Sequence, residues 1–138
     1  MPRNFTVTHE NSVAVATLDV PGRTMNVIDA AELRDAVEEV LADVSVAGMV
    51  IASGKEGSFG GGADLTTPPA LASDPGSESF LLATHDLMER MRGAAKPILV
   101  AINGYALGGA LEVSLGGSTL IASDRTTLGD RPGRGERR

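Results

Sequence analysis

Two glycine-rich segments follow runs of apolar residues and contain the residues best suited to chemistry. Residues 58–65 read Ser-Phe-Gly-Gly-Gly-Ala-Asp-Leu, and residues 103–112 read Asn-Gly-Tyr-Ala-Leu-Gly-Gly-Ala-Leu-Glu. Glycine allows the backbone to approach a ligand closely and exposes its amides. In the second segment the amides would also lie where a short helix begins, which favours developing negative charge. Glu112 follows Gly109 by about one helical turn, so it could serve the same pocket as an acid or base.

Other reactions fit these segments less well. Neither segment has the Gly-x-Gly-x-x-Gly spacing of a dinucleotide site or the Gly-Lys-Ser/Thr of a Walker loop. Ser114 lacks the flanking glycines of a nucleophile elbow. The chain has no cysteine, which excludes a disulfide scaffold, a thiolate zinc site and a cysteine nucleophile. The two histidines, His9 and His85, lack partners at ligand spacing, so no metal is expected.

Strand and helix patterns alternate along the chain, which favours an α/β fold with a mainly parallel sheet. Alternating and continuous apolar runs predict strands, and apolar residues at helical spacing predict helices. The predicted elements are a hairpin over 5–8 and 13–18, a helix over about 29–41, a strand over 49–52, a helix from about 77 to 91, a strand over 98–102, a short helix after 109 and a strand over 119–122.

Two helical features and one loop are specific enough to check. Asp29 and Glu32 have the spacing of a capping box, in which each side chain accepts from the backbone amide of the other. Arg34 and Glu38 are spaced to pair on the helix surface. Residues 66–76 are rich in Pro, Ala, Ser and Asp and are interpreted as a mobile loop.

Composition indicates one globular domain. The chain has 138 residues, of which 42% are hydrophobic and 22% charged. A net charge of −6 argues against a nucleic-acid surface. The first residues do not resemble a secretory signal and no apolar run is long enough to span a membrane, so a cytoplasmic protein is expected.

The C-terminal residues differ in composition from the rest. Residues 131–138 contain four arginines and one glutamate, whereas the remainder of the chain is strongly acidic. We expect 130–138 to be a disordered tail rich in Arg and Gly, with a basic contact arm as the alternative.

Several linked motifs resemble the crotonase (enoyl-CoA hydratase/isomerase) family. Residues 59–65 are similar to its Phe-x-Ala-Gly-Ala-Asp-Ile/Leu segment, and residues 96–112 to its Lys-Pro…Ala-Ile-Asn-Gly-x-Ala-x-Gly-Gly-Gly-x-Glu-Leu segment. Residues 121–124 match the Ile-Ala-Ser-Asp that follows. Residues 21–26 resemble the Pro-Gly-x-x-Met-Asn variant of the hydratase domain in bifunctional fatty-acid-oxidation enzymes. The resemblance covers residues 4–129.

The resemblance implies the N-terminal part of a crotonase-like fold, a superhelix of repeated ββα units, over residues 1–129. It implies hydration of a trans-2-enoyl-CoA to a 3-hydroxyacyl-CoA, with CoA as part of the substrate and no separate cofactor. The amides of Ala63 and Gly109 would bind the thioester oxygen, and Glu112 would be the first of two catalytic glutamates. The residues implied to bind substrate or CoA are Arg23, Met25, Gly62, Ala63, Asp64, Leu65, Gly108 and Gly109.

The chain departs from the family pattern after Gly129. Pro132 aligns where the family has its second glutamate, while Asp130 and Glu136 are out of register. A frameshift or premature stop would explain this change. The part implied to build the family's trimer or hexamer is missing, so we expect an uncovered sheet edge that favours self-association or partial disorder.

Three alternative functions remain open. An isomerase would use the same oxyanion hole. A catalytically incomplete remnant could bind CoA weakly or act as a subunit beside full-length relatives. A nucleotide-binding α/β domain is the third, although the glycine spacing disfavours it.

Overall fold

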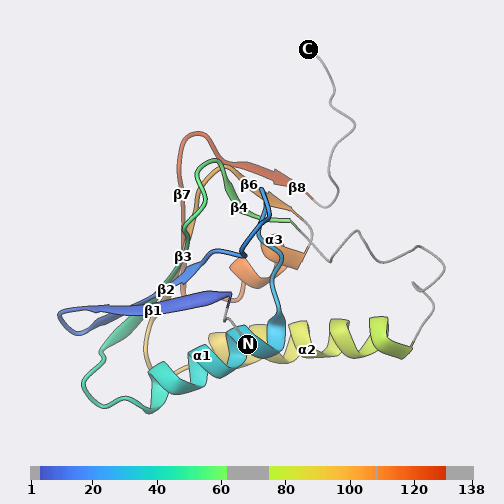
Figure 1. Cartoon of the computed structure of the whole chain (residues 1–138). Coiled ribbons are helices and arrows are strands. Elements are labelled where there is room, and N and C mark those ends of the chain that lie inside the picture. The colour runs from blue at the N-terminus through green and yellow to red at the C-terminus, as the bar shows by residue number, and fades with distance from the viewer. Residues whose placement is uncertain (1–3, 62–74, 108, 130–138) are drawn as a thin grey trace, which may run out of the picture.

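The computed structural model describes residues 4–61, 75–107 and 109–129 (Figure 1). The predictions for the loop 66–76, up to residue 74, and for the tail 130–138 concern residues outside this description. No helix in the described ranges is long and apolar enough to cross a membrane. The elements in chain order are β1 Phe5–Glu10, β2 Val13–Leu18, α1 Ala30–Ala42, β3 Gly48–Ser53, β4 Ser58–Gly60, α2 Pro75–Arg92, β5 Ile98–Ile102, β6 Tyr105–Leu107, α3 Gly109–Ser114, β7 Thr119–Ala122 and β8 Thr127–Gly129.

The larger sheet has five strands in the order β1-β2-β3-β5-β7. β1 and β2 form the predicted antiparallel hairpin, and every later neighbour pairs in parallel. On β2 the buried positions alternate, so that Ala14, Ala16 and Leu18 face the core. β5 alternates in the same way. The parallel pairing of β2, β3, β5 and β7 confirms the expectation of a mainly parallel α/β sheet.

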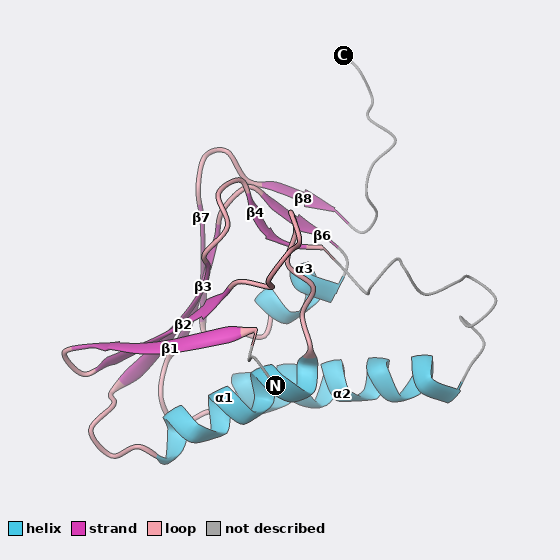
Figure 2. Cartoon of the chain, in the orientation of Figure 1, coloured by secondary structure: helices cyan, strands magenta, loops and turns pink. Residues whose placement is uncertain are grey.

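A second sheet of three parallel strands, in the order β4-β6-β8, lies beyond the carboxyl end of the first (Figure 2). Its strands fall in segments that the sequence patterns assigned to glycine-rich loops or left unassigned, so that assignment was wrong in part. Each strand has only three residues, which is too short for alternation of apolar and polar residues to be detected.

Helix α1 begins where the sequence predicts, but only half of the capping box forms. The Asp29 carboxylate accepts a hydrogen bond from the Glu32 backbone amide at 3.1 Å. The Glu32 carboxylate instead accepts from the backbone amide and the side-chain amide of Asn4, the latter at 3.0 Å. The prediction that Glu32 caps Asp29 was therefore wrong, because Glu32 joins the helix to the residue that precedes β1.

Ion pairs join α1 to α2, which lie side by side on one side of the larger sheet (Figure 1). Arg90 binds both carboxylate oxygens of Glu38, with Nε–Oε1 and Nη2–Oε2 distances of 2.5 and 3.1 Å. Arg34 lies 4.0 Å from Asp86. Arg34 and Glu38, expected to pair with each other, thus each have a partner on α2.

The ammonium group of Lys96 lies against the end of α1. It donates to the carbonyl oxygens of Asp43 at 2.6 Å and Val40 at 3.3 Å. These carbonyls also accept from the backbone amides of Asp43 and Val46, so Lys96 adds a cationic donor at the end of the helix where the helix dipole favours one. The lysine of the Lys-Pro motif therefore has a structural role, because it fixes the start of β5 against α1.

The strands at the two edges of the larger sheet differ in polarity. β1 ends in Thr8, His9 and Glu10, which are exposed. All four residues of β7 are exposed as well, yet Leu120 and Ile121 are apolar, with 36% and 52% of their surface exposed. The expected uncovered edge is therefore present at β7.

Gly104 makes the tightest backbone contact in the described part of the chain. Its φ is +62°, and a Cβ added there would lie 1.9 Å from the carbonyl oxygen of Gly57. The adjacent Tyr105 amide donates to that same oxygen at 3.2 Å. The turn before β6 can therefore form only if residue 104 has no side chain.

We expect Gly104→Ala to lower the free energy of unfolding by more than about 3 kcal/mol, because left-handed strain adds to a backbone clash. Gly22→Ala is the matched control, since Gly22 has a φ of +72° and nothing within 4 Å of an added Cβ. This control should cost only about 1–2 kcal/mol. Urea unfolding of the two variants checks the difference, and equal losses would contradict the importance of the Gly57 contact.

The guanidinium of Arg90 holds the pKa of Glu38 below its ordinary value of 4.5 by hydrogen bonding. This stabilisation is present above about pH 4.5 and is lost as the pH falls through the lower pKa of the folded state. We expect the difference in melting temperature between the wild type and Glu38→Gln to shrink between pH 7 and pH 3. The difference in melting temperature between the wild type and Arg90→Gln should shrink over the same pH range, because this variant also removes the ion pair. If either difference were as large at pH 3 as at pH 7, the assignment to the Glu38–Arg90 pair would be contradicted.

Candidate functional site

Parallel pairing of β4 with β6 brings the two glycine-rich segments to one edge of the smaller sheet. Ser58 lies opposite Tyr105, and Gly60 lies opposite Ala106. Parallel strands have their carboxyl ends on the same side, which is where α/β proteins place ligands. The first segment leaves β4 there, and the second leaves β6 there to begin α3 at Gly109.

Gly60 and Ala110 hold the two segments in direct contact. A Cβ added to Gly60 would lie 3.0 Å from the Cβ of Ala110, which is completely buried. Ala110 stands where the family motif Gly-Gly-Gly has its third glycine. In the structure its methyl group fills the space beside Gly60, so the small residue on β4 accommodates the larger one on α3.

Helix α3 has one buried side and one exposed side. Ala110, Val113 and Ser114 are buried, and the Ser114 hydroxyl donates to the Ala110 carbonyl at 2.6 Å. Ser114 is therefore bonded within its own helix. Glu112 is exposed, and its spacing from position 109 places both on the same side of the helix.

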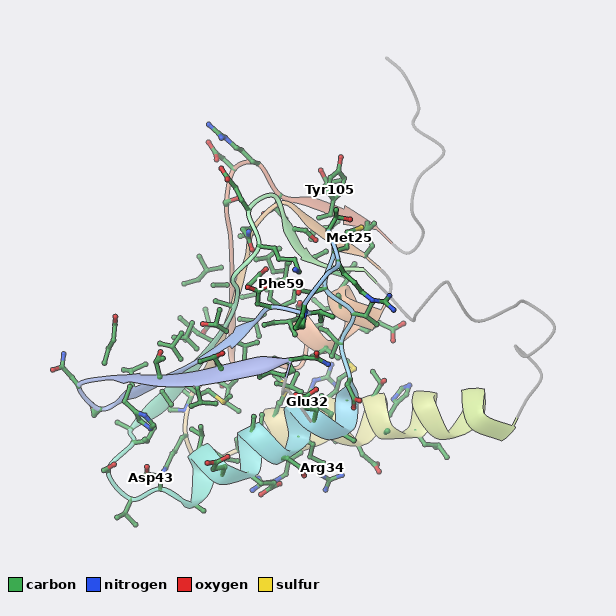
Figure 3. The ribbon with its side chains drawn as sticks, in the orientation of Figure 1. Met25, Glu32, Arg34, Asp43, Phe59 and Tyr105 are labelled. Atoms are coloured by element: carbon green, nitrogen blue, oxygen red, sulfur yellow. The ribbon has the colours of Figure 1, made fainter. Side chains whose placement is uncertain are left out.

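The segment 21–26 reaches the same edge through Met25 (Figure 3). The methyl carbon of Met25 lies 3.5 Å from the place where a Cβ on Gly61 would be. Met25 is partly exposed, and Arg23 is exposed. Met25, one of the described residues implied to bind CoA, thus lies beside the first glycine segment.

Several residues of the expected site lie outside the described ranges. Their roles in oxyanion or CoA binding stay predictions. These residues are Gly62, Ala63, Asp64, Leu65 and Gly108.

Asn26 is a central residue that the sequence analysis did not single out. Its side chain is completely buried, and its Oδ1 accepts from the Val20 amide at 2.9 Å. Its Nδ2 donates to Leu18 O, Ser53 Oγ and Phe59 O at 3.0, 2.9 and 3.1 Å. The signal was the final Asn of the Pro-Gly-x-x-Met-Asn motif, but the motif alone does not show what this amide binds.

The described residues hold no group of three acidic or histidine side chains able to bind a metal ion. His85 is exposed on α2, and Nε2 of His9 lies 3.9 Å from a carboxylate oxygen of Asp43. Neither histidine is part of the edge where the glycine segments meet.

We expect Gly60→Ala to reduce the free energy of unfolding by about 1–3 kcal/mol, because its methyl would press on Ala110. Ala110→Gly should cost about 1–2 kcal/mol through lost helix propensity and packing. The double variant should lose about 1 kcal/mol less than the sum of the two. Urea denaturation of all four proteins measures this coupling, and strict additivity would exclude the contact.

Comparison with known proteins identifies the family. The family model for enoyl-CoA hydratase/isomerase matches residues 8–131. The fatty acid oxidation complex subunit alpha of Shewanella loihica is 36% identical over 135 residues, which cover 94% of this chain and 19% of that protein. The corresponding protein of Shewanella frigidimarina is 35% identical over 125 residues, which cover 87% of this chain and 18% of that protein.

Solved structures agree with this match. Enoyl-CoA hydratase from Thermoplasma volcanium superposes with a TM-score of 0.81 and 26% identity, covering 94% of this chain and 52% of that one. The enoyl-CoA hydratase from Bacillus anthracis superposes with a TM-score of 0.81 and 25% identity, covering 91% of this chain and 49% of that one. The chain thus spans about half the length of these structures and about one fifth of the curated relatives. The crotonase-like fold is confirmed, and the chain belongs to the enoyl-CoA hydratase/isomerase family.

Proposed function

We propose that this chain contributes an oxyanion hole for acyl-CoA thioesters, formed by the backbone amides of Ala63 and Gly109. The reaction is hydration of a trans-2-enoyl-CoA, in which the oxygen of water bonds to C3 and a proton is added at C2. Atoms balance without a further reactant, and CoA is part of the substrate. By analogy with the named relatives, the pathway is fatty-acid oxidation.

The observation that carries the proposal is the meeting of both glycine segments at one sheet edge. β4 and β6 pair in parallel, and β4 contacts α3 so closely that a Cβ on Gly60 would lie 3.0 Å from the Cβ of Ala110. Ala63 follows Gly60 by three residues, and Gly109 precedes Ala110 directly. Amides held in this way act on charge that develops on the thioester oxygen, and one such donor is worth about 10²–10³ in rate.

Glu112 is the proposed acid or base on the Gly109 side of this edge. Its exposure leaves the carboxylate open to water and to substrate. A carboxylate within reach of water at C3 can accept its proton, and the same group can return a proton to C2. Arg23 and Met25 are proposed to lie along the CoA moiety, and Met25 already borders Gly61.

We expect the purified chain to hydrate crotonyl-CoA and Glu112→Gln to lower kcat/KM at least about 100-fold, because the acid or base is removed without a change of shape. The assay follows the loss of absorbance of the conjugated thioester. Glu10→Gln is the matched control, since Glu10 is an exposed glutamate on β1, in the other sheet.

The outcomes separate hydration from its alternatives. No turnover by a folded sample would overturn hydration by this chain and leave CoA binding or a subunit role, which binding of the unreactive butyryl-CoA would then test. Turnover that survives Glu112→Gln would overturn the role of Glu112 alone. Migration of the double bond in a 3-enoyl-CoA, without hydration, would indicate an isomerase.

A further inference from the structure

The buried side-chain amide of Asn26 joins four separate parts of the chain. It binds the end of β2 through Leu18 O, the following turn through the Val20 amide, the end of β3 through Ser53 Oγ and β4 through Phe59 O. Two N–H groups are shared among three acceptors, and Oδ1 takes one donor. The amide therefore has a partner for each of its polar atoms, as a buried amide requires.

The backbone of Asn26 adds a second contact on the other side of Gly60. Its carbonyl oxygen accepts from the Gly61 amide at 2.7 Å. The side chain binds Phe59 O and the backbone binds Gly61 N, so residue 26 holds the chain immediately before and after Gly60. The position and direction in which the backbone leaves β4 are thus set by Asn26.

Ser53 extends the contact by one further step. Its hydroxyl accepts from Asn26 Nδ2, donates to Ser58 O at 2.6 Å and accepts from the Lys55 amide at 3.0 Å. Asn26 and Ser53 together bind the carbonyls of Ser58 and Phe59. The short strand β4 is therefore held by side chains as well as by pairing with β6.

We propose that Asn26 is a positioning residue for the first glycine-rich segment, which it holds where that segment leaves β4 at Gly61, and that Ser53 supports it. The proposed donor Ala63 follows Gly61 by two residues in the sequence, so we expect the oxyanion hole proposed above to respond to a displacement at Gly61. A displacement of a fraction of an ångström is enough to weaken a donor aimed at a developing charge. Asn26 touches no reacting atom, and the inference rests on the function proposed above.

The experiment reports on carbonyl polarisation and requires no turnover. The probe is 4-dimethylaminocinnamoyl-CoA, whose conjugated thioester absorbs at longer wavelength when its carbonyl accepts strong hydrogen bonds. When protein is in excess over the probe, the wavelength of the absorption maximum reports the geometry around the bound thioester. A smaller fraction of folded protein lowers the intensity of the shifted band but does not change its wavelength. The wild type should shift the absorption to longer wavelength.

Asn26→Asp should lose at least half of the wild-type shift. It keeps an acceptor for the Val20 amide but turns an oxygen toward Phe59 O, which loses its donor. Ser53→Ala should lose part of the shift. Ser53→Thr should keep the shift, because threonine retains the hydroxyl. Val37→Ala removes buried methyl groups from α1 and controls for general destabilisation, so it should keep the full shift.

Amide hydrogen exchange gives a second measurement without ligand. The Gly61 amide should exchange at least about tenfold faster in Asn26→Asp than in Val37→Ala. A full shift in both Asn26→Asp and Ser53→Ala, or unchanged Gly61 exchange, overturns the positioning role. If Asn26→Asp does not fold, the Ser53→Ala and Ser53→Thr pair decides. If the wild type itself gives no shift, the proposed oxyanion hole is overturned. If the wild type and all variants give the same shift, only the positioning role of Asn26 is overturned.

Discussion

The parallel pairing of β4 with β6 is the constraint on which the candidate site depends. Ser58 and Gly60 on one strand lie opposite Tyr105 and Ala106 on the other. Because the strands run the same way, the segments that follow them leave from one edge. An antiparallel pair would send them to opposite ends of the sheet. The site is therefore a consequence of strand direction before any catalytic side chain is considered.

Close approach of backbones is the second requirement, and it explains where small residues occur. The Gly57–Gly104 contact brings the turns before β4 and β6 together, and the Gly60–Ala110 contact closes β4 on α3. No side chain can fit at the Gly57–Gly104 contact. The Gly60–Ala110 contact has room for the methyl group of Ala110 but not for another methyl group on residue 60. The Asn26 side-chain amide then adds a hydrogen bond from outside the sheet to the short strand β4, through Phe59 O.

Apolar residues are well buried in most of the molecule but are exposed near the edge strand β7. Most of the core lies between the helices α1 and α2 and the strands β2, β3 and β5. Toward β7 and β8 the apolar residues Leu115, Ile121 and Leu128 are each about half exposed. The solved enoyl-CoA hydratases have about as much chain again without a counterpart here. An unpaired strand with apolar side chains is a surface on which further chain can pack.

The sequence alone determined the hairpin, the helix that begins after Asp29, the buried strands at residues 49–52 and 98–102, and the family. These depend on local periodicity, capping and linked motifs, which are visible in neighbouring residues. Tertiary structure alone decided that Glu32 binds Asn4, that Arg90 pairs with Glu38, and that three-residue strands form a second sheet. It also decided the partners of Asn26, because a buried amide bonds to whichever groups the fold brings near it, and those groups are far apart in the sequence.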